Sequence, residues 1–113
     1  GGDPRLAEAE RLFRDQRYEE AARAGAAAEA GGPLGAGGYL LIGLAMSRAG
    51  DPFHAVPKLA EAVRLDPASA DAWYELGWAY ETAGDKDQAT DTWKAAADRF
   101  PGDPRFALVL RGR

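Results

Sequence analysis

Apolar and small residues lie at helical spacing along the chain, most clearly in its last third. Between residues 70 and 83 they fall at i, i+3, i+4 and i+7, one face of a helix: Trp73, Leu76, Gly77 and Tyr80. Ser69 is placed to cap this helix, and Gly84 to end it, because glycine adopts the left-handed backbone conformation at little cost. Asp85 is placed to cap a second helix, whose inner face holds Ala89, Trp93 and Ala96. Residues 70–103 are therefore predicted to form two antiparallel helices.

The same pattern recurs along the chain with a step of 34 residues. Three prolines mark the step, Pro33, Pro67 and Pro101, and three alanines keep it, Ala21, Ala55 and Ala89. A period of this size is typical of stacked-repeat proteins. We therefore expect a single domain of three repeats, 2–35, 36–69 and 70–103, each an antiparallel helix pair. Asp103 and Pro104 then begin a short closing helix over 104–111, because aspartate caps helices and proline fits their first turn.

Three irregularities interrupt the pattern. Pro57 falls inside the expected second helix of its repeat, where a kink or a late helix start is predicted because proline cannot donate a backbone hydrogen bond. Gly37 and Gly38 are expected to delay or loosen the start of their helix. Gly25 stands where Leu59 and Trp93 stand in the later repeats. The first repeat is also the most polar, as a terminal repeat should be.

These positions resemble the tetratricopeptide repeat (TPR) family, and the resemblance covers most of the chain. The third repeat matches best, at eight positions: Trp73, Leu76, Gly77, Tyr80, Ala89, Trp93, Ala96 and Pro101. The family implies an all-α, right-handed superhelical α-solenoid. It also implies a non-catalytic interaction module, in which the first helix of each repeat lines a concave groove that binds a protein or peptide.

A candidate ligand groove follows from that resemblance, one residue past the packing face of each first helix. It contains Leu6, Glu10, Phe13, Arg14, Leu40, Leu44, Ser47, Arg48, Tyr74, Trp78, Glu81 and Thr82. Family members that grip the C-terminal carboxylate of chaperones carry basic and amide residues at the matching places. Apolar, aromatic and acidic residues stand there in this chain, so the carboxylate clamp is expected to be absent. An apolar segment of a partner fits such a groove, with Arg14 and Arg48 placed to hold an acidic side chain.

Two other interpretations of the aromatic residues remain open. Trp78 and Tyr74 can pack against Leu40 and Leu44 between repeats, or under the closing helix. The closing helix would cover them through Phe106, Leu108 and Leu110. The apolar side chains Phe106, Val109 and Leu110 also fit a structural module that self-associates or stacks on further repeats.

Composition narrows the range of functions. Of the 113 residues, 14 are basic and 18 acidic, giving a net charge of −4, which argues against nucleic-acid binding. There is no cysteine, and His54 is the single histidine, so zinc sites lack their usual ligands. No apolar stretch is long enough to span a membrane, and no signal peptide is visible. We expect no enzymatic role, metal or cofactor. Because the chain begins Gly1-Gly2 without methionine, we also expect it to be a domain of a larger protein.

Overall fold

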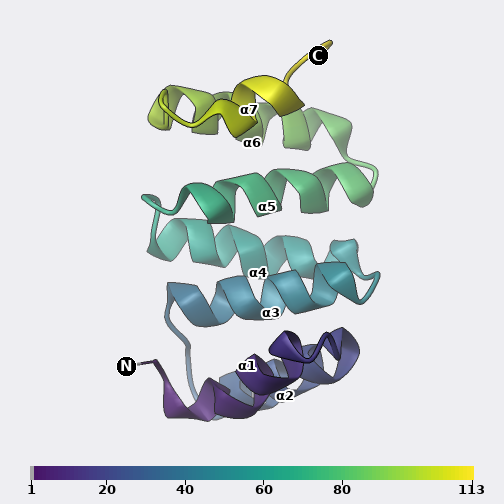
Figure 1. Cartoon of the computed structure of the whole chain (residues 1–113), viewed down its shortest axis with the longest axis vertical. Helices are drawn as coiled ribbons and strands as arrows, with labels where there is room; N and C mark the ends of the chain where they lie inside the picture. Colours follow the sequence, from purple (N-terminus) through teal and green to yellow (C-terminus); the bar gives the residue numbers. More distant parts are fainter. Residues whose placement is uncertain (1) are drawn as a thin grey trace.

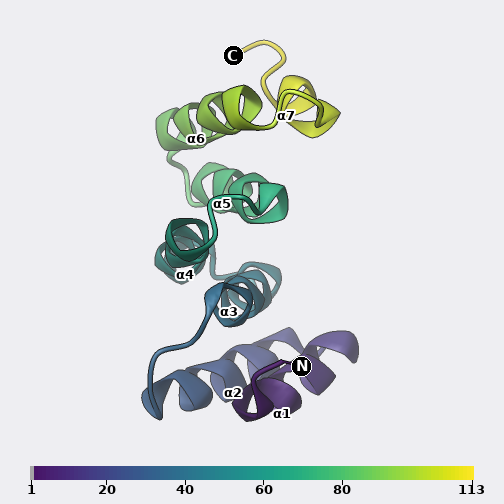
Figure 2. The ribbon, with the colours of Figure 1, turned by 90° about the vertical axis from the view of Figure 1, so that its left-hand side faces the viewer.

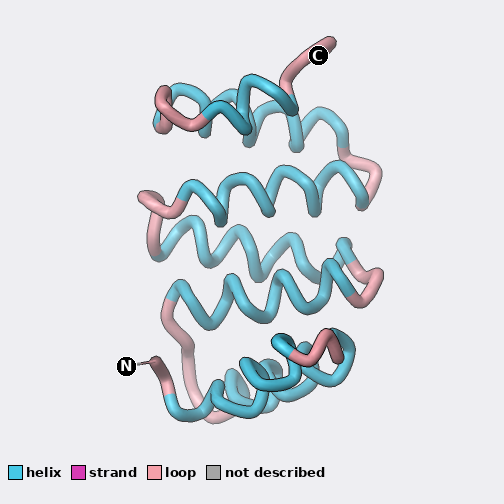
Figure 3. The backbone as a smooth tube through the Cα atoms, viewed as in Figure 1, coloured by secondary structure: helices cyan, strands magenta, loops and turns pink. Residues whose placement is uncertain are grey.

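The computed structural model describes residues 2–113, and within them every regular element is helical (Figure 1 and Figure 3). A 3₁₀ turn, Pro4–Leu6, leads into seven α-helices: α1 (Ala7–Arg14), α2 (Tyr18–Ala30), α3 (Ala36–Arg48), α4 (Pro52–Leu65), α5 (Ala70–Thr82), α6 (Lys86–Arg99) and α7 (Pro104–Val109). The predicted all-α class, with three helix pairs and a short closing helix, is confirmed.

The helices form an elongated stack in which each helix packs mainly on its neighbours in sequence. The odd-numbered helices also contact one another directly, α1 with α3 and α3 with α5. In Figure 2, α3 and α5 lie on one side of the stack and α4 and α6 on the other. The same view shows α3, α4 and α5 nearly end-on while α2 runs across it, so the helix directions rotate along the stack. The odd-numbered helices therefore share one long face, called the odd-helix face below.

The turns inside the second and third repeats use glycine followed by aspartate. Gly50 and Gly84 adopt left-handed φ angles of 89° and 93°, and Asp51 and Asp85 then accept hydrogen bonds from backbone N–H groups of α4 and α6. In the first repeat, Gln16 takes the glycine position with a φ of 62°. A side chain in this conformation costs about 1–2 kcal/mol, so the first turn is less favourable than the other two.

Close helix crossings explain why small residues recur at the packing positions. A Cβ built on Gly43 would lie 2.5 Å from Leu59 Cγ, and one on Gly77 would collide with the indole of Trp93. Gly25 makes the equivalent contact between the first two repeats, where a Cβ would lie 2.5 Å from Ile42 Cγ1. The glycine that interrupts the sequence pattern at 25 therefore makes room for a side chain from α3.

The structure contradicts two expectations about where helices begin. α3 begins at Ala36, so Gly37 and Gly38 do not delay it; Gly38 is buried, and a Cβ there would lie 3.0 Å from Leu6 Cδ1. α4 begins at Pro52 and continues through Pro57, so the late start does not occur. Pro57 is exposed, and the Phe53 carbonyl that loses its partner lies one turn earlier on the same helix face.

Candidate functional site

The residues of the candidate groove occupy α1, α3 and α5 and differ in exposure. Leu6 is only 5% exposed and belongs to the core with Leu34 and Tyr39, so it presents almost no surface to a ligand. Leu40 and Leu44 are half-buried, whereas Arg14 and Arg48 are exposed. The accessible part of the groove therefore excludes Leu6 and runs from Arg14, at the end of α1, to α3 and α5.

Trp78 is the most prominent apolar side chain on this face. It is 38% exposed, and its ring makes edge contacts with Trp93, at 5.0 Å between centroids, and with Tyr74, at 6.4 Å. Tyr74 also contacts Phe106 of α7 at 6.2 Å, and the Arg105 guanidinium lies 4.8 Å from its ring centroid. The closing helix thus covers part of Tyr74 and leaves Trp78 facing solvent.

The two predicted arginines lie toward the other end of the same face. The Arg48 guanidinium stacks on the rings of Phe13 and Tyr18, 5.2 and 5.9 Å from their centroids. Within residues 2–113, neither Arg14 nor Arg48 forms an ion pair. Their charges are therefore available to an acidic ligand, and the stacking fixes the direction in which Arg48 points.

Two polar residues of the predicted groove have partners within the chain, and a third is buried. Glu81 Oε1 lies 2.7 Å from Arg113 Nη2, an ion pair whose angles do not meet hydrogen-bond geometry. The Thr82 hydroxyl donates to the Trp78 carbonyl at 2.8 Å. The Ser47 hydroxyl is buried and has no hydrogen-bond partner in the described part of the chain. Glu81 and Thr82 thus contribute less to a binding surface than the sequence predicts.

Glu75 is a residue of this region that the sequence reasoning missed. It is half-buried on α5, and burial raises the pKa of its carboxyl; Arg48 and Arg105 oppose that rise and Asp71 adds to it. In the other repeats its position holds Ala7 and Leu41. That departure from the repeat pattern was the signal available in the sequence.

Two hollows also open on the odd-helix side. One of about 450 Å³ lies between α1 and α3, and a small one of about 70 Å³ lies beside α3. The first is lined by Leu6, Glu10 and Leu41 together with glycines of the connection to α3. Parts of the predicted groove thus line real concavities, although Trp78 itself stands on an open surface.

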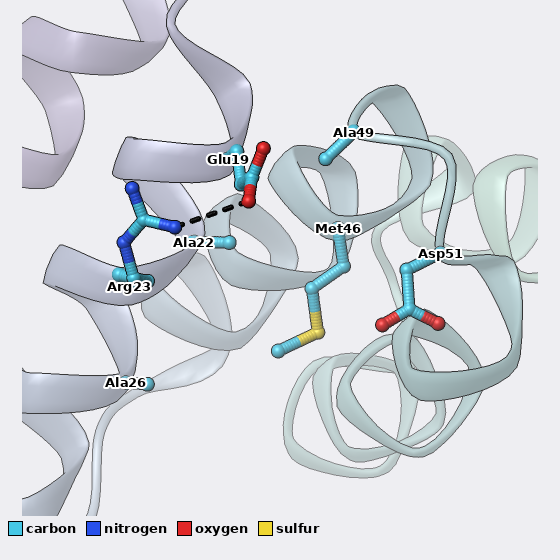
Figure 4. A pocket seen from close by; sticks show the side chains of 7 residues that line it. All are labelled: Glu19, Ala22, Arg23, Ala26, Met46, Ala49 and Asp51. Carbon is cyan, nitrogen blue, oxygen red and sulfur yellow. Dashed lines mark hydrogen bonds and ion pairs between the residues drawn. The ribbon is translucent and has the colours of Figure 1, made fainter.

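A second set of cavities lies where the turn of each repeat meets the preceding repeat. Volumes of about 420, 620 and 760 Å³ occur along the stack. Most lining residues of the first two are related by the 34-residue step, as are three residues of the third. Figure 4 shows the first, between α2 and α3, with Met46 pointing toward α2. These junction cavities were not predicted from the sequence, because they combine residues that lie far apart along the chain.

Other chemistry is sparse in the structure. The His54 imidazole is exposed and lies 2.8 Å from Asp51 Oδ2, an interaction at the start of α4. Residues 2–113 contain no group of three or more histidine, cysteine, aspartate or glutamate side chains placed to hold a metal ion. No helix described here is long and apolar enough to cross a membrane.

A family model assigns the chain to a family, and solved structures share its fold. The family model of the tetratricopeptide repeat matches residues 40–104, more than half of the chain, and the chain belongs to this family. The fold is similar to the crystal structure of MamA, with a TM-score of 0.85 and 22% identity over 96% of this chain and 66% of that one. It is also similar to YrrB, a TPR protein with an unusual peptide-binding site, with a TM-score of 0.81 and 21% identity.

The matched structures are longer than this chain. The YrrB match covers 87% of this chain and 50% of that one, so the chain spans about half of YrrB and two thirds of MamA. No curated protein matches it. TPR repeats are generally non-catalytic interaction modules that bind protein or peptide partners.

Proposed function

We propose that this chain is a non-catalytic interaction module that binds a segment of a partner protein on its odd-helix face. The observation that carries the proposal is the exposure of Trp78 beside Tyr74. A large aromatic side chain left in water on a repeat surface is typical of an interaction site, and tryptophan is enriched among residues that dominate binding energy. The peptide-binding site of YrrB, a protein of the same fold, is consistent with this function.

The chemistry of the surface indicates the kind of segment that it would bind. Leu40, Leu44, Tyr74 and Trp78 offer an apolar and aromatic strip, and Arg14 and Arg48 add positive charge at its end. An extended or helical segment with apolar anchors and one acidic residue fits this arrangement. Without the family's carboxylate clamp, the surface is not expected to bind chaperone C-terminal tails.

Replacement of Trp78 tests this proposal. Trp78→Ala is expected to weaken partner binding by about 2 kcal/mol or more, as for an interface hot spot. The partner is first captured from the source cell with the wild-type chain. Its affinity for the wild type, for Trp78→Ala and for a control variant is then measured by titration calorimetry. Leu65→Ala is the matched control, because Leu65 is also a large exposed apolar side chain, 41% exposed, but lies at the end of α4.

Two results would separate binding from packing. A loss of affinity with an unchanged melting temperature supports a ligand contact at Trp78. An unchanged affinity together with a large fall in melting temperature would contradict the proposal and make Trp78 a packing residue against Trp93.

A second candidate function is self-association through the closing helix. Leu108 of α7 is 55% exposed, with Val109 and Leu110 half-buried beside it. An apolar helix side of this kind also suits contact with a second copy or with further repeats.

A further inference from the structure

The junction cavities provide an internal comparison, because the repeat places equivalent residues throughout the first two and in part of the third. Most of the lining positions of the first cavity reappear 34 residues later in the second. Glu19, Ala22, Arg23, Met46 and Ala49 of the first correspond to Phe53, Val56, Pro57, Tyr80 and Ala83 of the second. The third cavity continues the series with Asp87, Thr90 and Asp91. Where two cavities have different residues at equivalent positions, their chemistry can therefore be compared directly.

The first and third cavities are lined by charged side chains. In the first, Arg23 pairs with Glu19 at 3.2 Å beside the opening (Figure 4). In the third, Arg113 donates to the Thr90 hydroxyl at 3.1 Å, and Lys86 and Lys94 complete a polar wall. The first cavity keeps an apolar part formed by three alanines and Met46, whereas charged and polar side chains dominate the third.

The second cavity is apolar at the matched positions. Phe53, Val56, Pro57 and Tyr80 line about 620 Å³ between α4 and α5. Phe53 is 74% exposed, the most exposed of the large apolar side chains, and makes an edge contact only with the neighbouring His54 ring, at 5.4 Å. A hydrophobic cavity with an aromatic side chain at its edge is typical of a binding site.

Helix stability does not explain a phenylalanine at this position. Phe53 is the second residue of α4, in the first turn, where the helix dipole favours a negative charge. The equivalent residues, Glu19 and Asp87, supply that charge in the first turns of α2 and α6. Phe53 gives up this favourable interaction and exposes an aromatic ring to water. A ligand that covers the ring would explain both the missing negative charge and the exposed aromatic side chain.

The charges around the cavity define its partner. Asp85 lines it, at the position that Asp51 holds in the first cavity, and Asp51 also contacts the lining residue His54. No lysine or arginine is among the lining residues, in contrast to the first and third cavities. A bound segment therefore meets carboxylates at the rim of an apolar cavity, which complements lysine or arginine beside an apolar side chain.

We propose that the cavity between Phe53, Pro57 and Tyr80 is a second docking site, which takes a partner segment carrying an apolar side chain next to basic residues. It lies at the turns between paired helices, whereas the site proposed above lies on the odd-helix face. The two sites differ in charge, since one presents arginines and the other aspartates. One partner can therefore contact both through segments of opposite charge.

The test uses a synthetic peptide as the probe, the acetylated and amidated Lys-Lys-Phe-Leu-Lys-Lys. Titrated into the isotope-labelled chain, it is expected to shift amide resonances around Phe53, Val56 and Tyr80 saturably. Phe53→Glu restores the kind of residue found at the equivalent positions and is expected to raise the dissociation constant about tenfold or more. The melting temperature of the Phe53→Glu variant should not fall, because Phe53 is exposed.

Matched variants make the outcome decisive. Leu108→Glu, which changes an exposed apolar residue elsewhere, and Trp78→Ala on the odd-helix face should leave the peptide affinity unchanged. At this cavity, followed by the resonances of Phe53, Val56 and Tyr80, the peptides Glu-Glu-Phe-Leu-Glu-Glu and Lys-Lys-Ser-Gly-Lys-Lys should bind much more weakly. The proposal is overturned if no saturable shifts appear, if they centre on Tyr74 and Trp78, or if Phe53→Glu has no effect. It is also overturned if Phe53→Glu instead abolishes a dimer in sedimentation, since a second copy would then be the occupant.

Discussion

Gly77 lies where the two helices of the third repeat cross, and its missing side chain is what allows that crossing. Its hydrogen atom faces the indole of Trp93, which is fully buried and donates from Nε1 to the Tyr74 carbonyl at 3.2 Å. A methyl group at residue 77 would push this indole out of its packing position and away from the Tyr74 carbonyl. The size of one residue thus sets the distance between α5 and α6.

The expected effect can be measured by equilibrium unfolding in urea. Gly77→Ala should lower the free energy of unfolding by about 1–3 kcal/mol, because the added carbon overpacks the crossing. Gly37→Ala is the matched control: a Cβ there meets no atom within 4 Å, and alanine should raise helix stability by about 0.5–1 kcal/mol. Equal effects of the two substitutions would contradict the packing role of Gly77.

At the scale of the element, the closing helix depends on contacts outside itself. α7 has only 6 residues, too few for a helix to be stable alone in water. Asp103 caps it, and the fully buried Phe106 fixes it to the stack through ring contacts with Phe100 at 6.0 Å and Tyr74 at 6.2 Å. The same ring covers part of the aromatic end of the odd-helix face, so α7 limits how much of that face a partner can reach.

Truncation of that side chain should release the helix. Phe106→Ala is expected to lower the free energy of unfolding by about 3–5 kcal/mol through loss of a buried aromatic side chain. The substitution should accelerate amide hydrogen exchange more in residues 104–109 than in α3 and α4. Leu108→Ala changes an exposed residue of the same helix and should have a much smaller effect; a comparable effect would argue against Phe106 as the anchor.

At the scale of the whole molecule, the stack measures 40 × 27 × 22 Å, and its ends determine whether copies associate. In repeat stacks each unit contacts its neighbours, so an uncovered apolar end favours a further unit. If self-association is the function, Leu108 is placed to mediate it, and the sedimentation coefficient should rise with protein concentration.

Leu108→Glu should abolish that concentration dependence, because it places a charge in an apolar contact. Phe53→Glu, a matched change at another exposed apolar residue, should leave it intact. A wild-type chain that stays monomeric at all concentrations would exclude self-association and leave partner binding as the function supported.

The sequence by itself determined the helical class, the family and most of the helix boundaries, because these follow from spacing, capping residues and the 34-residue step. Ser69 accepts a hydrogen bond from the Ala72 amide as its position predicts, and Gly84 takes the left-handed conformation. It misjudged the helix starts at Gly37 and Pro57, where the surrounding helices tolerate residues that weaken an isolated helix.

Only the tertiary structure decided which side chains reach solvent. Leu6 and Trp78 belong to the same predicted groove face, at repeat positions one helical turn apart, yet Leu6 is buried against α3 and Trp78 is exposed. The cavity at Phe53 and Tyr80 is formed by residues from two repeats. Exposure and cavity shape depend on how neighbouring repeats meet, and a one-dimensional pattern does not contain that information.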